Sequence, residues 1–303
     1  MNLKKPLVFI IFISLFACSD IYSQINNYDN SICWEIRNPK TAQPSYILGS
    51  FHILDTTKVD FPVQKVKELI DQCGNYCMEI NISTIDSSQM KTIVGNCFMS
   101  DLKLNFRDSL GSESYKKLIQ IADSSKGILK TLKPYLSIIK PEFIGLYVAI
   151  DKLSGKSLFF SQCNFGMDSF FEQYAISKKY RIHGLESFQE QMDMILGHTY
   201  NESILALRSC INDYYSGDSI DLFKNYVNQD LKFFKDSGFL DSTMIKRNKV
   251  MADGIDLLLQ QKSVFVVIGA GHLPSKVGVL NLLAQRGYLI SPYHLDLGIK
   301  RKE

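Results

Sequence analysis

The segment Val264-Phe265-Val266-Val267-Ile268-Gly269-Ala270-Gly271-His272 decides the fold. Its first five residues form a continuous apolar run, which is typical of a strand buried on both faces of a parallel sheet. A glycine ends this run, and a histidine follows three residues later. The same arrangement occurs near the start of the chain, in Tyr46-Ile47-Leu48-Gly49-Ser50-Phe51-His52. The two histidines are therefore expected just beyond the ends of two strands.

Other apolar runs, bounded by polar or turn-forming residues, predict the remaining strands of the sheet. These runs are Ile32–Ile36, Tyr76–Ile80, Arg181–Leu185 and Tyr288–Ile290. Pro62 suits a first helical position, and apolar residues at helical spacing follow it up to Gly74. The resulting strand–helix–strand unit, from Tyr46 to Ile80, favours a parallel pair of strands.

Helical patterns dominate the rest of the chain, and no internal repeat or low-complexity linker interrupts it. They cover most of 84–161, then 167–178, much of 188–260 and about 276–285. We therefore expect an α/β fold with one domain, built on a central mixed, largely parallel sheet with a large helical insertion.

The first 23 residues predict an export signal. Lys4 and Lys5 precede an apolar run, Pro6 to Ala17, that is too short to span a bilayer comfortably. Leu15-Phe16-Ala17-Cys18 fits a lipoprotein signal with a lipid on Cys18, whereas Ile21-Tyr22-Ser23 fits ordinary cleavage before Gln24. The folded domain is then 24–303, and we expect a periplasmic, cell-surface or secreted protein that meets the membrane only through a lipid on Cys18.

Charge and cysteine content exclude some classes of function. The formal net charge is +3 and no Lys or Arg run stands out, so a nucleic-acid partner is not expected. Six cysteines follow Ser23, which permits disulfides in an exported protein, although buried thiols are an equal alternative. Paired Cys-x-x-Cys motifs are absent from the sequence, which argues against a zinc cluster.

Polar residues lie at the ends of four predicted strands or just after them. They are His52, Glu79, Glu186 and His272. In open parallel sheets the ligand site lies beyond the carboxyl ends of the strands, so these side chains are expected to converge. Two imidazoles and a carboxylate can hold a divalent metal and leave positions open for water and substrate.

We therefore predict His52, Glu79 and His272 as ligands or near-ligands of the metal, with Glu186 as the second acidic group. Either catalytic glutamate, Glu79 or Glu186, could accept the proton as general base. A metal-free acid/base mechanism with the same residues stays open, because their distant spacing fixes no ligand set. A purely structural alternative is that each histidine only caps a helix or binds loop backbone.

An ordered set of short motifs resembles the Tiki/TraB/GumN family and covers nearly all of 32–292. The motifs are Trp34-Glu35-Ile36, Tyr46 to His52, Met78-Glu79-Ile80, Leu132-Lys133-Pro134-Tyr135, Phe165-Gly166-Met167-Asp168, Gly184-Leu185-Glu186-Ser187 with Glu190-Gln191, Arg247-Asn248, Val267 to Leu273 and Arg286-Gly287-Tyr288. The resemblance implies a divalent-metal protease, usually activated by manganese or cobalt, and maps the family's two histidines and glutamate onto His52, His272 and Glu79. Two departures are Asn81, where the family often has an acidic residue, and Ser275, where a glycine is common.

The sequence thus predicts an exported metal-dependent hydrolase, a peptidase acting on peptides or proteins with a divalent metal (Mn, Co or Zn). Arg247 is expected to bind substrate or stabilise negative charge, or else to form an ordering salt bridge with Asp168 or Glu186. The resemblance also leaves open a non-catalytic protein that binds and inhibits a peptide signal, as in pheromone shutdown. A haem-handling surface lipoprotein is a third alternative, for which the sequence has no specific motif.

Overall fold

A computed structural model of the protein describes residues 31–41, 43–51, 54, 59–99, 105–154, 166–216, 222–232 and 242–300. The predicted export signal, with Cys18, lies outside these residues, and so do His52 and Cys163. In the part of the chain that is described, no helix is both long and apolar enough to cross a membrane.

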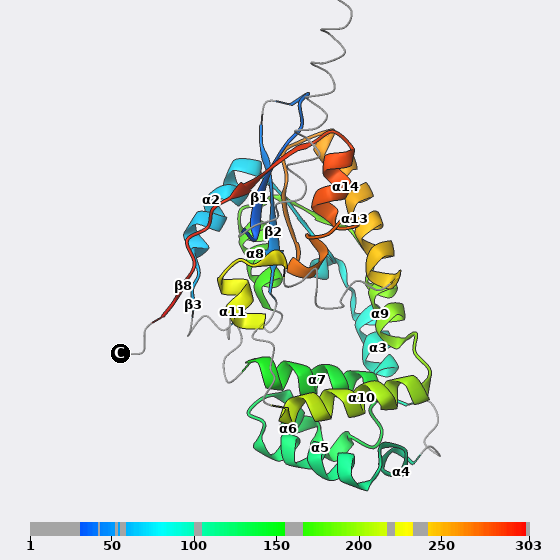
Figure 1. The fold of residues 1–303 in the computed structure, drawn as a ribbon. Helices are drawn as coiled ribbons and strands as arrows, with labels where there is room; N and C mark the ends of the chain where they lie inside the picture. Colours follow the sequence, from blue (N-terminus) through cyan, green and yellow to red (C-terminus); the bar gives the residue numbers. More distant parts are fainter. Residues whose placement is uncertain are drawn as a thin grey trace, which may run out of the picture.

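A six-stranded mixed sheet forms the centre of the fold, with the strand order β5-β4-β6-β2-β1-β7 (Figure 1). The strands are β1 (Cys33–Arg37), β2 (Ser45–Ser50), β4 (Asn75–Met78), β5 (Arg181–Gly184), β6 (Phe265–Gly269) and β7 (Leu289–Tyr293). Strands β5, β4, β6 and β2 are parallel, whereas β1 runs antiparallel to both β2 and β7. The predicted α/β fold with a mixed, largely parallel sheet is confirmed.

Strand β6 occupies the middle of the sheet because its side chains can be buried on both faces. Residues 265–268 have no exposed surface. Val267 pairs with Leu48 of β2 on one side and with Met78 of β4 on the other. Strands β2 and β4 are thus parallel, as the strand–helix–strand unit predicts, but β6 lies between them. The long apolar run forms strand β6 between β2 and β4, where both of its faces are buried. Strands β2 and β4 therefore do not pair directly.

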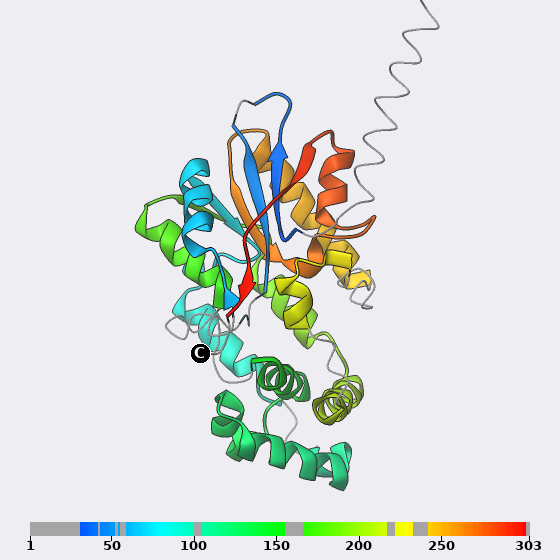
Figure 2. The ribbon, with the colours of Figure 1, turned by 60° about the vertical axis from the view of Figure 1, so that its left-hand side comes forward.

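Helices cover both faces of the sheet. Helices α2 (Val63–Cys73) and α8 (Gly166–Ser177) pack on one face, and α13 (Ser242–Leu259) and α14 (Val279–Gln285) cover the other (Figures 1 and 2). Helix α14 begins three residues later than the sequence predicts, because a turn in which the Gly278 N–H donates to the Ser275 carbonyl precedes it. A separate two-stranded sheet pairs β3 (Val59–Asp60) with β8 (Gly298–Ile299).

The helical insertion is a layer with its own hydrophobic core. Its main helices are α3 (Ser87–Asn96), α4 (Phe106–Leu110), α5 (Ser112–Ser124), α6 (Ile128–Leu132), α7 (Pro141–Ser154) and α10 (Tyr200–Tyr215). Leu118, Ile144 and Leu207 are among the fully buried residues of this core. The chain enters the insertion after β4, through α3, and again after β5, through α9 (Phe188–Leu196). The insertion therefore lies beyond the edge at which the parallel strands end (Figures 1 and 2).

The described cysteines are free thiols. Cys33, Cys73 and Cys77 are buried in the core of the sheet, and Cys97 and Cys210 are half-buried in the insertion. Burial raises the pKa of the Cys73 thiol to about 11. In this structure, therefore, these five side chains pack in the two cores without cross-linking them.

Candidate active site

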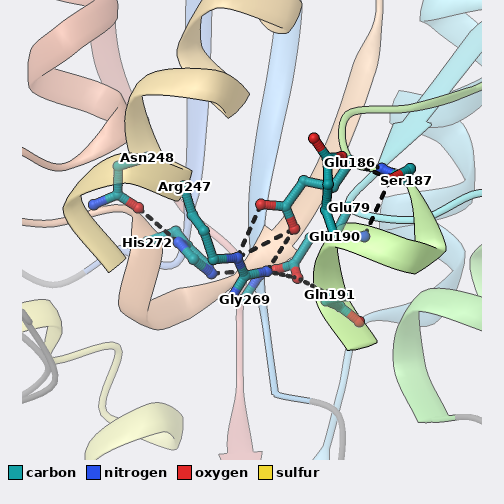
Figure 3. A network of polar contacts seen from close by, with 9 residues as sticks. All are labelled: Glu79, Glu186, Ser187, Glu190, Gln191, Arg247, Asn248, Gly269 and His272. Atoms are coloured by element: carbon teal, nitrogen blue, oxygen red, sulfur yellow. Dashed lines mark hydrogen bonds and ion pairs between the residues drawn. The ribbon is translucent and has the colours of Figure 1, made fainter. Parts of the chain in front are cut away.

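Four of the five predicted site residues meet at the carboxyl edge of the parallel strands (Figure 3). Glu79 follows β4 directly, Glu186 comes two residues after the end of β5, and His272 comes three residues after the end of β6. Arg247 reaches them from helix α13. The fifth residue, His52, lies outside the described residues.

Arg247 joins the two glutamates in one buried ionic network. Its Nε lies 2.9 Å from Glu186 Oε1, and its Nη2 lies 2.7 Å from Glu186 Oε2 and 2.9 Å from Glu79 Oε2. The side chains are only 16% (Arg247), 9% (Glu79) and 5% (Glu186) exposed. Burial lowers the pKa of Arg247, but the hydrogen bonds and negative charges of Glu186 and Glu79 outweigh that effect, so the pKa is raised. Arg247 is thus a permanent cation between two carboxylates.

The ordering salt bridge expected between Arg247 and Glu186 is present, and Glu79 is a second partner that the sequence did not indicate. Asp168, the other expected partner, is buried near the start of α8, where its backbone carbonyl accepts a hydrogen bond from the Tyr76 hydroxyl. Asn81 hydrogen-bonds the Ser83 hydroxyl just after β4. Within the described residues, the ion pairs of Arg247 are those with Glu79 and Glu186.

Glu79 differs from Glu186 in how its two oxygens are held. Its Oε2 accepts hydrogen bonds from Arg247 and from Gln191 Nε2, at 3.2 Å. Its Oε1 accepts the backbone N–H of Gly269, at 2.6 Å, and lies 3.6 Å from His272 Nε2. Of the four carboxylate oxygens in this network, three accept from Arg247, and the fourth, Glu79 Oε1, faces the histidine.

His272 is held from its other ring nitrogen. Its Nδ1 lies 2.6 Å from Asn248 Oδ1, and Asn248 Nδ2 donates to the carbonyl of Val277 at 2.9 Å. His272 is 4% exposed and Asn248 is fully buried. The imidazole therefore has a fixed orientation, with Nε2 toward Glu79.

The glycines of the two Gly-x-x-His motifs allow this close approach. A Cβ on Gly269 would lie 3.2 Å from Glu79 Oε1, and a Cβ on Gly49 would lie 3.0 Å from Ala270 Cα. Glycine at these positions lets the ends of β2 and β6 pack against each other and against the carboxylate.

The departure at Ser275 affects the backbone. Ser275 has a φ of +89°, in the left-handed region that favours glycine. A glycine, which the family resemblance leads us to expect at this position, would adopt this conformation without strain.

Gln191, Asn248 and the Gly269 N–H belong to the site, although sequence reasoning gave them no role. Gln191 and Asn248 belong to motifs that carry the family resemblance, and this membership was the one sequence feature that could have indicated a role for them. A helix neighbour that orients a histidine leaves no periodic pattern, so its function becomes visible only once α13 is placed against β6.

The described donors fit two positions of a divalent-metal site. Metal–ligand distances of roughly 2.0–2.2 Å separate neighbouring ligands of one ion by about 3–3.5 Å, and His272 Nε2 and Glu79 Oε1 are 3.6 Å apart. An imidazole nitrogen and a carboxylate oxygen suit zinc, manganese or cobalt. Within the described residues no group of three His, Cys, Asp or Glu side chains could hold a metal. A third ligand would have to come from elsewhere in the chain.

Comparisons with known proteins identify a family and a relative. A model of the TraB/PrgY/gumN family matches residues 32–292. The metalloprotease TIKI2 of Danio rerio is 21% identical to this chain over 319 aligned positions, which cover 86% of the chain and 60% of that protein. The chain thus spans less than two thirds of this relative's length. No solved structure matches the chain significantly.

Proposed function

Because the chain belongs to the TraB/PrgY/gumN family, we propose that it is an exported metal-dependent hydrolase that cleaves peptides or proteins. The observation that carries the proposal is the approach of His272 Nε2 to Glu79 Oε1, 3.6 Å apart at the carboxyl edge of the sheet. The similarity to a protein named as a metalloprotease supports the same activity.

In this proposal His272, Glu79 and His52 hold one divalent ion. His52 follows β2, which is the direct neighbour of β6 in the sheet, so its strand ends beside that of His272. Manganese, cobalt or zinc are the ions that suit this ligand set. When bound, such an ion lowers the pKa of a coordinated water and polarises the scissile carbonyl.

Arg247 would bind the oxygen on which negative charge develops during hydrolysis. Glu186 holds the guanidinium through two of its nitrogens, and this leaves Nη1 without a hydrogen bond among the described residues. A fixed cation beside the reacting carbonyl stabilises the tetrahedral intermediate without reorganisation. Glu186 is then a residue that orients Arg247, since both of its oxygens accept from that side chain.

Substrates are expected to be peptides or proteins outside the cytoplasm. The first 23 residues carry the features of an export signal, and a lipid on Cys18 would keep the protein at a membrane surface. The helical insertion lies beyond the same sheet edge as the site, and we propose that it contacts the chain of a bound substrate.

Cleavage of a peptide library by purified residues 24–303, with and without manganese, cobalt or zinc, tests the proposal. Turnover is expected only with a metal, and it should be abolished by a chelator and by His272→Ala. Tight peptide binding without cleavage at any metal concentration, retained in His272→Ala, would instead identify the protein as a binder of peptide signals. Turnover that a chelator leaves unchanged would indicate a metal-free acid/base mechanism.

A further inference from the structure

We infer that Asn248 is a positioning residue, which keeps the proton of neutral His272 on Nδ1 and so presents Nε2 as an acceptor toward Glu79. The importance of this for catalysis rests on the proposed function. The preference for this tautomer comes from the contacts between His272, Asn248 and Val277.

The first step is the orientation of the Asn248 amide. A backbone carbonyl only accepts hydrogen bonds, so the side-chain nitrogen must face the carbonyl of Val277, 2.9 Å away. Turning the amide over would bring two oxygens together inside the protein. The side-chain oxygen therefore faces His272 Nδ1, 2.6 Å away.

The second step is the tautomer of His272. An amide oxygen cannot donate, so the hydrogen bond forms only if Nδ1 carries the proton. Asn248 is fully buried and His272 is 4% exposed, so water cannot replace a missing partner, and an unmatched pair of acceptors would be costly. A neutral imidazole with its proton on Nδ1 has its lone pair on Nε2.

The third step connects this tautomer to the site. The lone pair of Nε2 points toward the side of Glu79, whose Oε1 is also an acceptor, at 3.6 Å. Two acceptors at this separation repel each other unless a cation or a proton lies between them. A metal ion or a proton between these two atoms would remove the repulsion. Proteins usually orient a metal-binding histidine through a hydrogen bond to the ring nitrogen that does not bind the metal.

Helix α13 carries both Arg247 and Asn248. Arg247 and Asn248 are consecutive, so their side chains leave the helix in different directions, one toward the glutamates and the other toward the histidine (Figure 3). Helix α13 thus supplies both the cation that contacts the two glutamates and the amide that fixes the tautomer of His272.

NMR of the imidazole nitrogens tests the inference directly. Long-range ¹H–¹⁵N spectra of ¹⁵N-histidine-labelled residues 24–303, freed of metal by a chelator at about pH 8, where an ordinary imidazole is neutral, report the tautomer of each ring. The His272 signals are those lost in His272→Gln. We expect the Nδ1–H form in the wild type, and a change toward the Nε2–H form, which prevails in free histidine, in Asn248→Leu. Asn248→Asp, which keeps an acceptor, should retain the Nδ1–H form.

Asn281→Leu is the matched control. Asn281 is also a buried asparagine whose amide donates to a backbone carbonyl, that of Lys276, so its loss should leave the His272 signals unchanged. The wild-type spectrum is decisive even if Asn248→Leu fails to fold. A wild-type His272 with its proton on Nε2, or with both nitrogens protonated, overturns the inference, and so does an unchanged Nδ1–H form in folded Asn248→Leu.

Activity provides a second readout that separates this inference from the proposed function. If the protein is a metal-dependent hydrolase, Asn248→Leu should lower its metal affinity or turnover by roughly 10- to 100-fold, with Asn248→Asp closer to the wild type. An inactive protein with the expected tautomer would refute the proposed function and leave the role of Asn248 standing.

Discussion

His272 Nε2 lies 3.6 Å from Glu79 Oε1, although one residue follows strand β6 and the other follows strand β4. Two neighbouring parallel strands thus deliver an imidazole and a carboxylate to one point. The backbone of β6 contributes as well, because its last N–H, that of Gly269, donates to the same carboxylate oxygen.

Gly269→Ala should disturb the site, whereas Gly271→Ala in the same loop should not. A Cβ at position 269 would lie 3.2 Å from Glu79 Oε1 and 3.5 Å from His272 Cδ2, whereas a Cβ at position 271 meets nothing within 4 Å. Displacing a reacting group by a fraction of an ångström lowers the rate by roughly tenfold or more. Peptide hydrolysis by both variants measures the difference, and equal rates would show that the close approach at Gly269 is unimportant.

Arg247→Met should destabilise the protein by about 3 kcal/mol, because it leaves two buried carboxylates without their cation. Combining it with Glu79→Gln and Glu186→Gln should recover much of the loss, since the remaining amides carry no charge. Urea unfolding at neutral pH measures both effects. Arg37→Met is the control, because Arg37 is 57% exposed and forms an ion pair with Glu35 at the surface, and little change is expected there. A stable Arg247→Met single variant would contradict the account of the network.

Glu172→Gln should stabilise the protein at neutral pH but not at low pH. Burial, together with the nearby charge of Asp168, raises the pKa of the Glu172 carboxyl above its usual value, although hydrogen bonds from Ser83 oppose the shift. A carboxyl with a raised folded-state pKa stabilises the fold below its unfolded pKa, and that contribution is lost as the pH rises through the folded pKa. Urea midpoints from pH 4 to 8 should therefore diverge with rising pH in favour of the variant. Parallel curves would show that the shift is absent.

Ser275→Gly should raise the stability by about 1 kcal/mol. Ser275 holds a φ of +89°, and a left-handed conformation costs a residue with a Cβ about 1–2 kcal/mol, part of which glycine loses again in backbone entropy. Thermal unfolding of the two proteins provides the measurement. A lower melting temperature for the variant would mean that the hydrogen bond from the Val277 N–H to the Ser275 hydroxyl outweighs the backbone strain.

The sequence predicts the sheet well where burial decides the outcome. The run at 264–268 indicates a central strand because only a position with two neighbours and two covered faces buries every one of its side chains. The positions of Glu79, Glu186 and His272 follow from the same logic, since each lies at the end of a predicted strand or just after it. The expectation that they converge needed no information on side-chain contacts.

Other features depend on distances that a linear pattern does not contain. Strand β6 lies between β2 and β4 because it pairs with residues more than 180 positions away in the sequence. Helix periodicity could not place Arg247 between Glu79 and Glu186. The role of Asn248 could not be predicted from the sequence for the same reason. A buried asparagine inside a helix resembles any other polar position until its neighbours across the fold are known.

We propose above that His52, Glu79 and His272 share one divalent ion. Anomalous diffraction at the cobalt edge, from crystals of residues 24–303 grown with Co²⁺, tests it most directly. We predict one strong peak about 2.0–2.3 Å from His272 Nε2 and from Glu79 Oε1, with a nitrogen of His52 as the third protein ligand. Crystals that bind cobalt elsewhere, or in which His52 points away from the other two side chains, would contradict the account.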